Sequence, residues 1–214
     1  MQATRRILTL AVGFSTIAST LAAQGISIGL RGSGTFPTGS FSETTTQATA
    51  NTALIAGAKS GFGYGLDAAI SMGFIGIYAG FDHVSFDCQT ATCQTDGKYT
   101  LQGVTAGVKL TTPSVSMLRP FIKGGVTFND LNGGYGGQSS NVLTTDHAPG
   151  YEVGVGADIG FLGIVSLTPQ ARYIGQNLKA KIPGVSVTSS TATGQAVNYF
   201  TFDLGLSVHT PFGK

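Results

Sequence analysis

The sequence predicts an all-β protein: an eight-stranded, antiparallel, up-and-down transmembrane β-barrel with a polar, charge-filled interior. Three observations predict this fold. Charged residues make up only 10% of the chain, whereas soluble domains carry roughly 25% charged residues. Glycine accounts for 32 of the 214 residues. Apolar residues never form the uninterrupted run of about 18 that a membrane-spanning helix needs. Instead, apolar residues alternate with small or polar ones, with the period of two that is typical of β-strands.

Residues 1–23 have the three parts of a cleaved secretory signal peptide. Two arginines precede an apolar run over residues 7–17, and a small-residue stretch ends at Ala23. The alternative interpretation, a membrane anchor, would need a longer apolar run. We expect cleavage after Ala22 or Ala23, which leaves a single barrel domain over residues 24–214.

Removal of the signal peptide changes the charge balance. The mature chain keeps ten basic residues (12 − 2) against ten acidic ones, so it is formally neutral. A basic nucleic-acid-binding surface is therefore not expected. Gly-x-Gly repeats fall inside predicted strands with no helix after them, so they are not phosphate-binding loops, and no cofactor is predicted.

The clearest alternation lies in residues 151–161. Tyr151, Val153 and Val155 face one way, and Glu152 faces the other. Similar alternation predicts strands near residues 25–37, 60–72, 75–86, 98–110, 118–130, 150–161, 164–174 and 197–209. Ten residues of about 3.3 Å each, tilted near 40°, cross roughly 25 Å, which is the height of the apolar band of outer-membrane barrels.

The predicted connections alternate in length. The longer ones are residues 38–59, 87–97, 131–149 and 175–196, and the shorter ones are residues 73–74, 111–117 and 162–163. Long and short connections would then lie on opposite rims, as the extracellular loops and periplasmic turns of outer-membrane barrels do.

Alternation alone does not say which face is inside. A soluble, lipocalin-like barrel would be apolar inside, but the polar face here is mostly Gly, Ser and Thr with isolated charges, which is a poor coat for water. In a narrow lumen these charges can pair, and pairing offsets the cost of removing them from water. The predicted lumen charges are Arg31, Asp67, Asp82, Lys109, Arg119, Lys123, Glu152, Asp158, Arg172 and Asp203.

The apolar face would then contact lipid. Lipid offers no hydrogen bonds to the backbone, so the sheet must close on itself. Aromatic residues near the predicted strand ends are expected to form girdles at the membrane interfaces; these are Phe36, Phe62, Phe128, Tyr151, Phe161 and Tyr173.

Two cysteines, Cys88 and Cys93, lie in a polar segment between predicted strands. An exported chain meets an oxidising compartment, which favours a disulfide across this small loop. Metal binding would need more ligands than the loop offers.

The chain resembles the OmpA/OmpX-like outer-membrane β-barrel domain proteins. The resemblance rests on the signal peptide, the final strand, and residues 119–125, 150–156 and 167–173. It implies insertion by the barrel-assembly machinery, with Phe212 as the C-terminal assembly signal. Such motifs specify architecture far better than activity.

The histidines His83, His147 and His209 do not converge in the predicted topology, so a catalytic triad is not expected. His83 with Ser85 is the nearest pair for a lipid-modifying activity, which stays open beside the simpler interpretation as rim residues. Two lysines of the last loop, Lys179 and Lys181, are candidates for contact with lipopolysaccharide phosphates.

Together these features predict an outer-membrane protein, surrounded by lipid and lipopolysaccharide, without catalytic, metal or cofactor residues. The first functional hypothesis is a non-enzymatic structural or surface-interaction barrel whose extracellular loops meet an unknown ligand. The alternative is a narrow pore or transporter for small solutes.

Overall fold

Eight long strands form where the sequence alternates, and each is antiparallel to both of its neighbours. In the computed structural model they are β1 (Gly25–Thr38), β2 (Ala58–Met72), β3 (Ile75–Cys88), β4 (Lys98–Thr111), β5 (Leu118–Gly134), β7 (Ala148–Gly160), β8 (Val165–Leu178) and β10 (Gln195–His209). The structure describes residues 25–43, 56–88, 97–112, 117–134, 141–145, 147–161, 163–178, 180–181 and 195–210.

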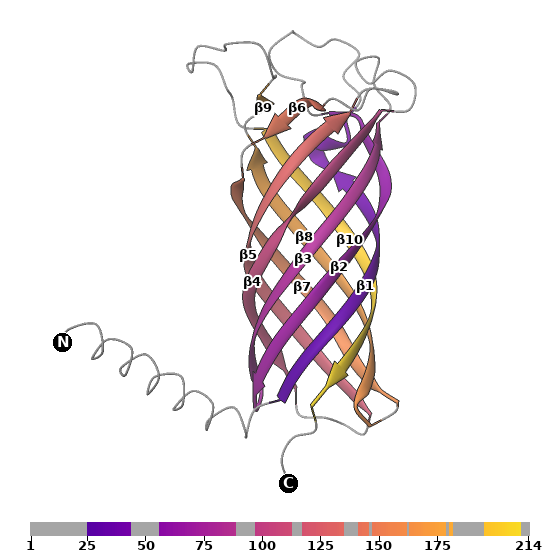
Figure 1. Ribbon diagram of the computed structural model, residues 1–214, viewed down its shortest axis with the longest axis vertical. Coiled ribbons are helices and arrows are strands. Elements are labelled where there is room, and N and C mark those ends of the chain that lie inside the picture. The colour runs from indigo at the N-terminus through magenta and orange to yellow at the C-terminus, as the bar shows by residue number, and fades with distance from the viewer. Residues whose placement is uncertain are drawn as a thin grey trace, which may run out of the picture.

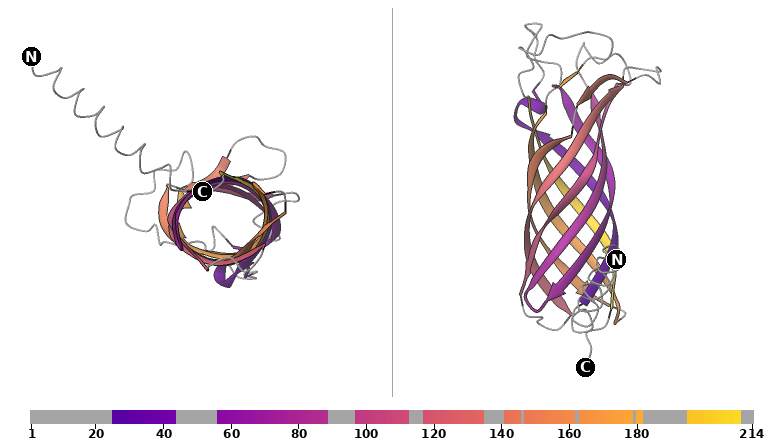
Figure 2. Two further views of the ribbon diagram at one scale, coloured as in Figure 1. Left: turned by 90° about the horizontal axis from the view of Figure 1, so that it is seen from below. Right: turned by 60° about the vertical axis from the view of Figure 1, so that its left-hand side comes forward.

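The sheet closes into a barrel (Figures 1 and 2). The strands follow one another in the order β4-β3-β2-β1-β10-β8-β7-β5, and a further pairing of β4 with β5 completes the ring. The first and last strands pair along their length, from Ser27 opposite His209 to Thr38 opposite Asn198. The predicted fold class is confirmed. Because the sheet is closed, the backbone N–H and C=O groups of the wall can all hydrogen-bond between strands and need no water.

The two rims differ. At the turn rim, drawn at the bottom of Figure 1, β2 turns into β3 and β7 into β8 through Gly73 and Gly163, whose φ angles are 67° and 71°. This backbone conformation favours glycine. At the opposite end, the loop rim, lie three short elements: η1 (Gly39–Phe41), β6 (Asn141–Thr145) and β9 (Ala180–Lys181). In the described part of the chain, no helix combines the length and hydropathy needed to cross a bilayer.

The short strands β6 and β9 were not predicted. β6 pairs with the upper part of β5, and β9 pairs with β6. They are missed because both fall in segments rich in Thr, Gly, Asn and Ser, where alternation is weak.

The outward face is apolar over the height of the barrel. Its exposed residues include Ile28, Leu30, Phe62, Leu66, Ile77, Val104, Ile122, Val153, Val155, Phe202 and Leu204. An apolar surface that surrounds the whole molecule is not tolerated in water. The soluble alternative, with these residues as a core, is therefore excluded by their orientation.

Aromatic residues cluster on this outer face toward the loop rim. The rings of Tyr173 and Phe200 lie 4.8 Å apart, and those of Tyr151 and Tyr173 lie 6.0 Å apart. Phe36 packs edge-on against Phe202 at 5.8 Å. Aromatic side chains in such positions anchor a barrel at the membrane interface.

Candidate functional site

The centre of the lumen is organised around Arg172 on β8, whose side chain is 1% exposed. Its guanidinium donates to Glu152 Oε2 at 2.8 Å, to both Asp82 oxygens at 3.1 Å, and to Asp203 Oδ2 at 2.5 Å. The three carboxylates come from β7, β3 and β10. One side chain therefore links four strands across the lumen.

Two other cations extend this arrangement. Arg31 on β1 contacts Asp67 and lies 2.7 Å from Asp82. Lys123 on β5 lies 3.0 Å from Glu152 Oε1, which also accepts a hydrogen bond of 2.9 Å from the Tyr78 hydroxyl. Buried ions in such mutual contact avoid the penalty that an isolated buried charge would suffer.

A separate pair lies nearer the turn rim. Lys109 Nζ is 2.7 Å from Asp158 Oδ2, and the Thr168 hydroxyl donates to Asp158 Oδ1 at 3.0 Å. Arg119, another predicted lumen cation, lies opposite Asp158 in the β5–β7 register and is half-buried. Every other predicted lumen charge belongs either to this pair or to the arrangement around Arg172.

Glycines leave the room that these long side chains occupy. A Cβ at Gly65 would lie 2.8 Å from Arg31 Nη2, and one at Gly154 would lie 3.1 Å from Arg172 Cγ. The polar face is therefore rich in glycine because a narrow barrel cannot hold both an arginine and a full set of neighbouring side chains.

An apolar cluster fills the lumen at the loop rim and was not predicted. Its buried members are Phe41, Ala58, Val84, Phe86, Tyr99, Leu101, Leu131, Ile174, Leu178, Val197 and Tyr199. The rings of Phe41 and Phe86 lie 5.1 Å apart, and those of Phe86 and Tyr199 lie 5.3 Å apart. Among the described residues, the interior therefore carries the predicted charges in its middle and lower parts and is largely apolar at the loop rim. The signal was present: Val84 and Phe86 continue the inward parity of Asp82.

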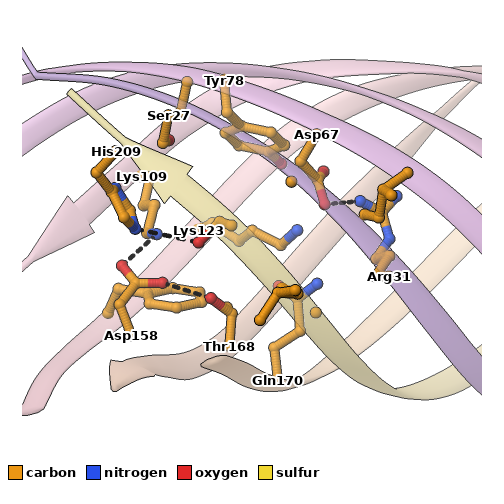
Figure 3. Close-up of a pocket in the computed structure, with 17 residues that line it drawn as sticks. Ser27, Arg31, Asp67, Tyr78, Lys109, Lys123, Asp158, Thr168, Gln170 and His209 are labelled. Atoms are coloured by element: carbon orange, nitrogen blue, oxygen red, sulfur yellow. Dashed lines mark hydrogen bonds and ion pairs between the residues drawn. The ribbon is translucent and has the colours of Figure 1, made fainter. Parts of the chain in front are cut away.

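A small cavity, the vestibule, lies among the lower charges of the lumen (Figure 3). This cavity of about 60 Å³ is lined by residues that include Ser27, Arg31, Lys109, Asp158 and His209. Phe121, an apolar residue on the inward face of β5, lies against it, and Lys109 Nζ is 3.9 Å from the centroid of its ring. The vestibule therefore borders the Lys109–Asp158 pair.

The three histidines lie apart. His83 points outward and stacks on Tyr64 at 5.0 Å, so the His83–Ser85 pair belongs to the outer surface. His147 is exposed and lies 3.3 Å from Asp130 at the loop rim. The hydroxyl–imidazole contact that does form is Ser207 Oγ to His209 Nε2, at 3.0 Å in the vestibule. This contact was not predicted, because alternation places Ser207 and His209 on the same face of a strand but does not indicate that they touch.

Several predicted features fall outside the described residues: the signal peptide over 1–23, Cys93, Lys179 and Phe212. Cys88 ends β3 and packs against the apolar cluster. Within the described ranges, no group of three or more His, Cys, Asp or Glu side chains is placed to hold a metal ion.

The disulfide stays a prediction that mass spectrometry can check. Unreduced peptides containing Cys88 and Cys93 are expected to be joined. Reduction should leave the barrel folded, because Cys88 lies at a strand end above the ion pairs. Recovery of two free thiols from the freshly purified protein would contradict the linkage.

The closed ring, its apolar exterior and its ion-paired interior define the class: the fold is that of the small eight-stranded outer-membrane β-barrels, as the sequence resemblance implied. Solved structures similar to this chain include three small barrels. The chain is similar to the outer membrane protein OprG from Pseudomonas aeruginosa (TM-score 0.58, 12% identity, covering 88% of this chain and 96% of that one). It is also similar to Neisserial surface protein A, with a TM-score of 0.54 and 13% identity, covering 87% of this chain and 96% of that one. The third is the outer membrane protein AlkL in lipid bilayers, with a TM-score of 0.53 and 14% identity, covering 90% of this chain and 92% of that one.

No family model matches the sequence, and no curated protein matches it either. At these identities the likeness concerns the fold alone. That fold, together with the apolar exterior, supports an outer-membrane location.

Proposed function

We propose that this protein is a non-enzymatic surface barrel of the outer membrane, in which a closed transmembrane cylinder carries the connections at the loop rim. The observation that carries this proposal is the occlusion of the lumen. Two successive layers fill it: the ion-paired layer around Arg172 and the apolar cluster above.

Each layer opposes the passage of ions for a different reason. In the charged layer, Arg172, Glu152 and Asp203 are almost fully buried, and both carboxylates are already paired with Arg172. A passing ion would have to displace these partners. In the apolar layer, an ion would lose its hydration with nothing to replace it, at a cost of several kcal/mol or more. A barrel filled in this way serves as a support for its loops.

The rival function is a narrow pore, and the vestibule favours it because a cavity of about 60 Å³ already lies in the lumen there. Planar-bilayer recording of the purified, refolded protein separates the two. We expect no sustained conductance above that of the detergent-only control. Reproducible single-channel steps that disappear when the same preparation is heat-denatured would contradict the closed barrel and establish the pore.

The partners are proposed from the apolar wall and from the sequence. The apolar wall contacts membrane lipid. Lipopolysaccharide phosphates are proposed to meet Lys179 and Lys181 near the loop rim, and the barrel-assembly machinery is proposed to use Phe212. An extracellular ligand would bind the connections at the loop rim.

A further inference from the structure

The ionic groups of the lumen are unevenly distributed along the barrel axis. In the middle, one cation, Arg172, contacts three carboxylates, those of Asp82, Glu152 and Asp203. Around the vestibule the balance is reversed, because three cations and two carboxylates line it: Arg31, Lys109, Lys123, Asp67 and Asp158. The described lumen charges balance as a whole, but their positive end lies toward the turn rim, and a narrow space lined by one sign of charge concentrates ions of the other sign.

Two buried groups of this lining have hydrogen-bond donors to spare. The side chain of Gln170 on β8 is 9% exposed and lines the vestibule, and its amide forms no hydrogen bond with any residue that the structure describes. Nε of Arg31, which is 4% exposed, is likewise without a hydrogen-bond acceptor among the described residues. Native proteins nearly always provide a partner for buried polar groups. These two donors therefore point to an acceptor inside the vestibule.

The vestibule has the size and the lining of a site for a small polar ligand. A water molecule needs roughly 15 Å³ of cavity space, so a cavity of about 60 Å³ has room for an oxyanion with four oxygens, such as inorganic phosphate. Ser27, Lys109, Lys123 and Gln170 reach it from β1, β4, β5 and β8 (Figure 3). Ser27 and His209, the pair nearest the turn rim in the β1–β10 register, also line it, and this rim faces the periplasm in outer-membrane barrels.

The lining suits an anion better than a cation. The carboxylate of Asp158 already lies 2.7 Å from Lys109 Nζ, and that of Asp67 contacts Arg31. A bound cation would have to displace one of these partners. An oxyanion displaces none, because a lysine ammonium has three donors and the ion pairs of Lys109 and Lys123 join each to a single carboxylate.

We propose that the vestibule is a binding site for a small oxyanion of the size of inorganic phosphate, which enters from the turn rim. Its oxygens accept hydrogen bonds from the Gln170 amide, the Ser27 hydroxyl and Lys109 Nζ, and its charge offsets the excess of cations in the lining. The ion pairs above it stay in place, so the site does not depend on whether the barrel conducts ions.

Titration with inorganic phosphate tests the site. The full-length protein is refolded in a detergent that carries no phosphate, and binding is measured by calorimetry at constant ionic strength. One phosphate is expected to bind per barrel. Gln170→Leu keeps every charge but removes the amide, so it should weaken binding by about tenfold, the contribution of one hydrogen bond to a charged group. Lys59→Gln removes an exposed lysine of β2 and should leave binding unchanged.

Ser27→Ala provides a milder variant if Gln170→Leu does not fold. Ser27 is only partly buried, and loss of its hydroxyl should weaken phosphate binding by about fivefold. The proposal is overturned if wild type shows no saturable binding, or if the folded vestibule variants bind phosphate as tightly as wild type. A loss of binding in Lys59→Gln as large as in these variants would also overturn it, because the phosphate would then be held by charge at no particular site.

A second measurement locates the anion. On addition of phosphate, the NMR signal of the Gln170 side-chain amide is expected to shift and then saturate. Asn129 supplies the matched control, because its amide also lies in the lumen but already donates to Gln176 Oε1 at 3.1 Å. A saturable shift at Gln170 without one at Asn129 supports the site. No shift at Gln170, or equal shifts at both amides, overturns it.

Discussion

Replacing Arg172 by alanine is expected to lower the free energy of unfolding by about 3–5 kcal/mol, the usual cost of breaking a buried ion pair from one side. Arg172 is the shared partner of Asp82, Glu152 and Asp203. Its removal leaves Asp203 without the cation that the structure gives it, and leaves Asp82 and Glu152 with one each. The loss is large because all three carboxylates are buried, so each loses an ionic partner without gaining exposure to solvent.

Urea unfolding in lipid vesicles measures this loss. Lys59→Ala is the control, because Lys59 is an exposed lysine of β2 outside the arrangement around Arg172, and its effect should be within about 0.5 kcal/mol of zero. Arg172→Lys keeps the charge but not the planar fork of donors, so it should fall between alanine and wild type. Equal, negligible effects of Arg172→Ala and Lys59→Ala would overturn the structural role of the charged layer.

Val155→Arg is expected to destabilise the barrel by about 2–4 kcal/mol, the cost of an arginine on the lipid face near the bilayer midplane. Val155 is 57% exposed and faces outward on β7. It lies roughly midway between Tyr151 and Phe161, two exposed aromatic residues near opposite ends of the strand. The penalty arises from lipid contact and not from a clash, because the side chain points away from the protein.

The matched control is the same substitution near a rim. Val208 is 52% exposed and lies one residue from the end of β10. Val208→Arg should cost only about 0–1 kcal/mol, as such substitutions do near the interface. The two variants are compared in the same vesicle titration. If both cost the same small amount, Val155 does not face the hydrocarbon core.

The fold was predictable because each strand carries its own signal. Alternation assigned the faces of Val155, Glu152 and Arg172 correctly, since a period of two needs no knowledge of neighbouring strands. Even Phe121, which breaks the chemical pattern, keeps the inward parity of Lys123 and lies inside.

What could not be predicted depends on how the strands are placed around the barrel. That Arg172 would meet Asp82 follows from strand tilt and stagger, which no single segment encodes. The apolar cluster was missed for another reason. Alternation marks a strand only where its two faces differ, and near the loop rim inward residues such as Phe86 and Leu101 are apolar as well. Inward charges therefore identified the lumen-facing residues of β3 only as far as Asp82, and not the apolar ones above it.

The pairing of β1 with β10 also constrains the order of folding. Bonds across this seam join residues as far apart as Ile26 and Thr210, which are separated by 184 positions. Contacts of such long range form slowly, because a large loss of chain entropy precedes them. Until β10 arrives, β1 presents an open edge that can pair with another chain and aggregate. An exported precursor of this kind must remain unfolded and shielded in transit, and a chain truncated before β10 should fail to insert at all rather than form a smaller barrel.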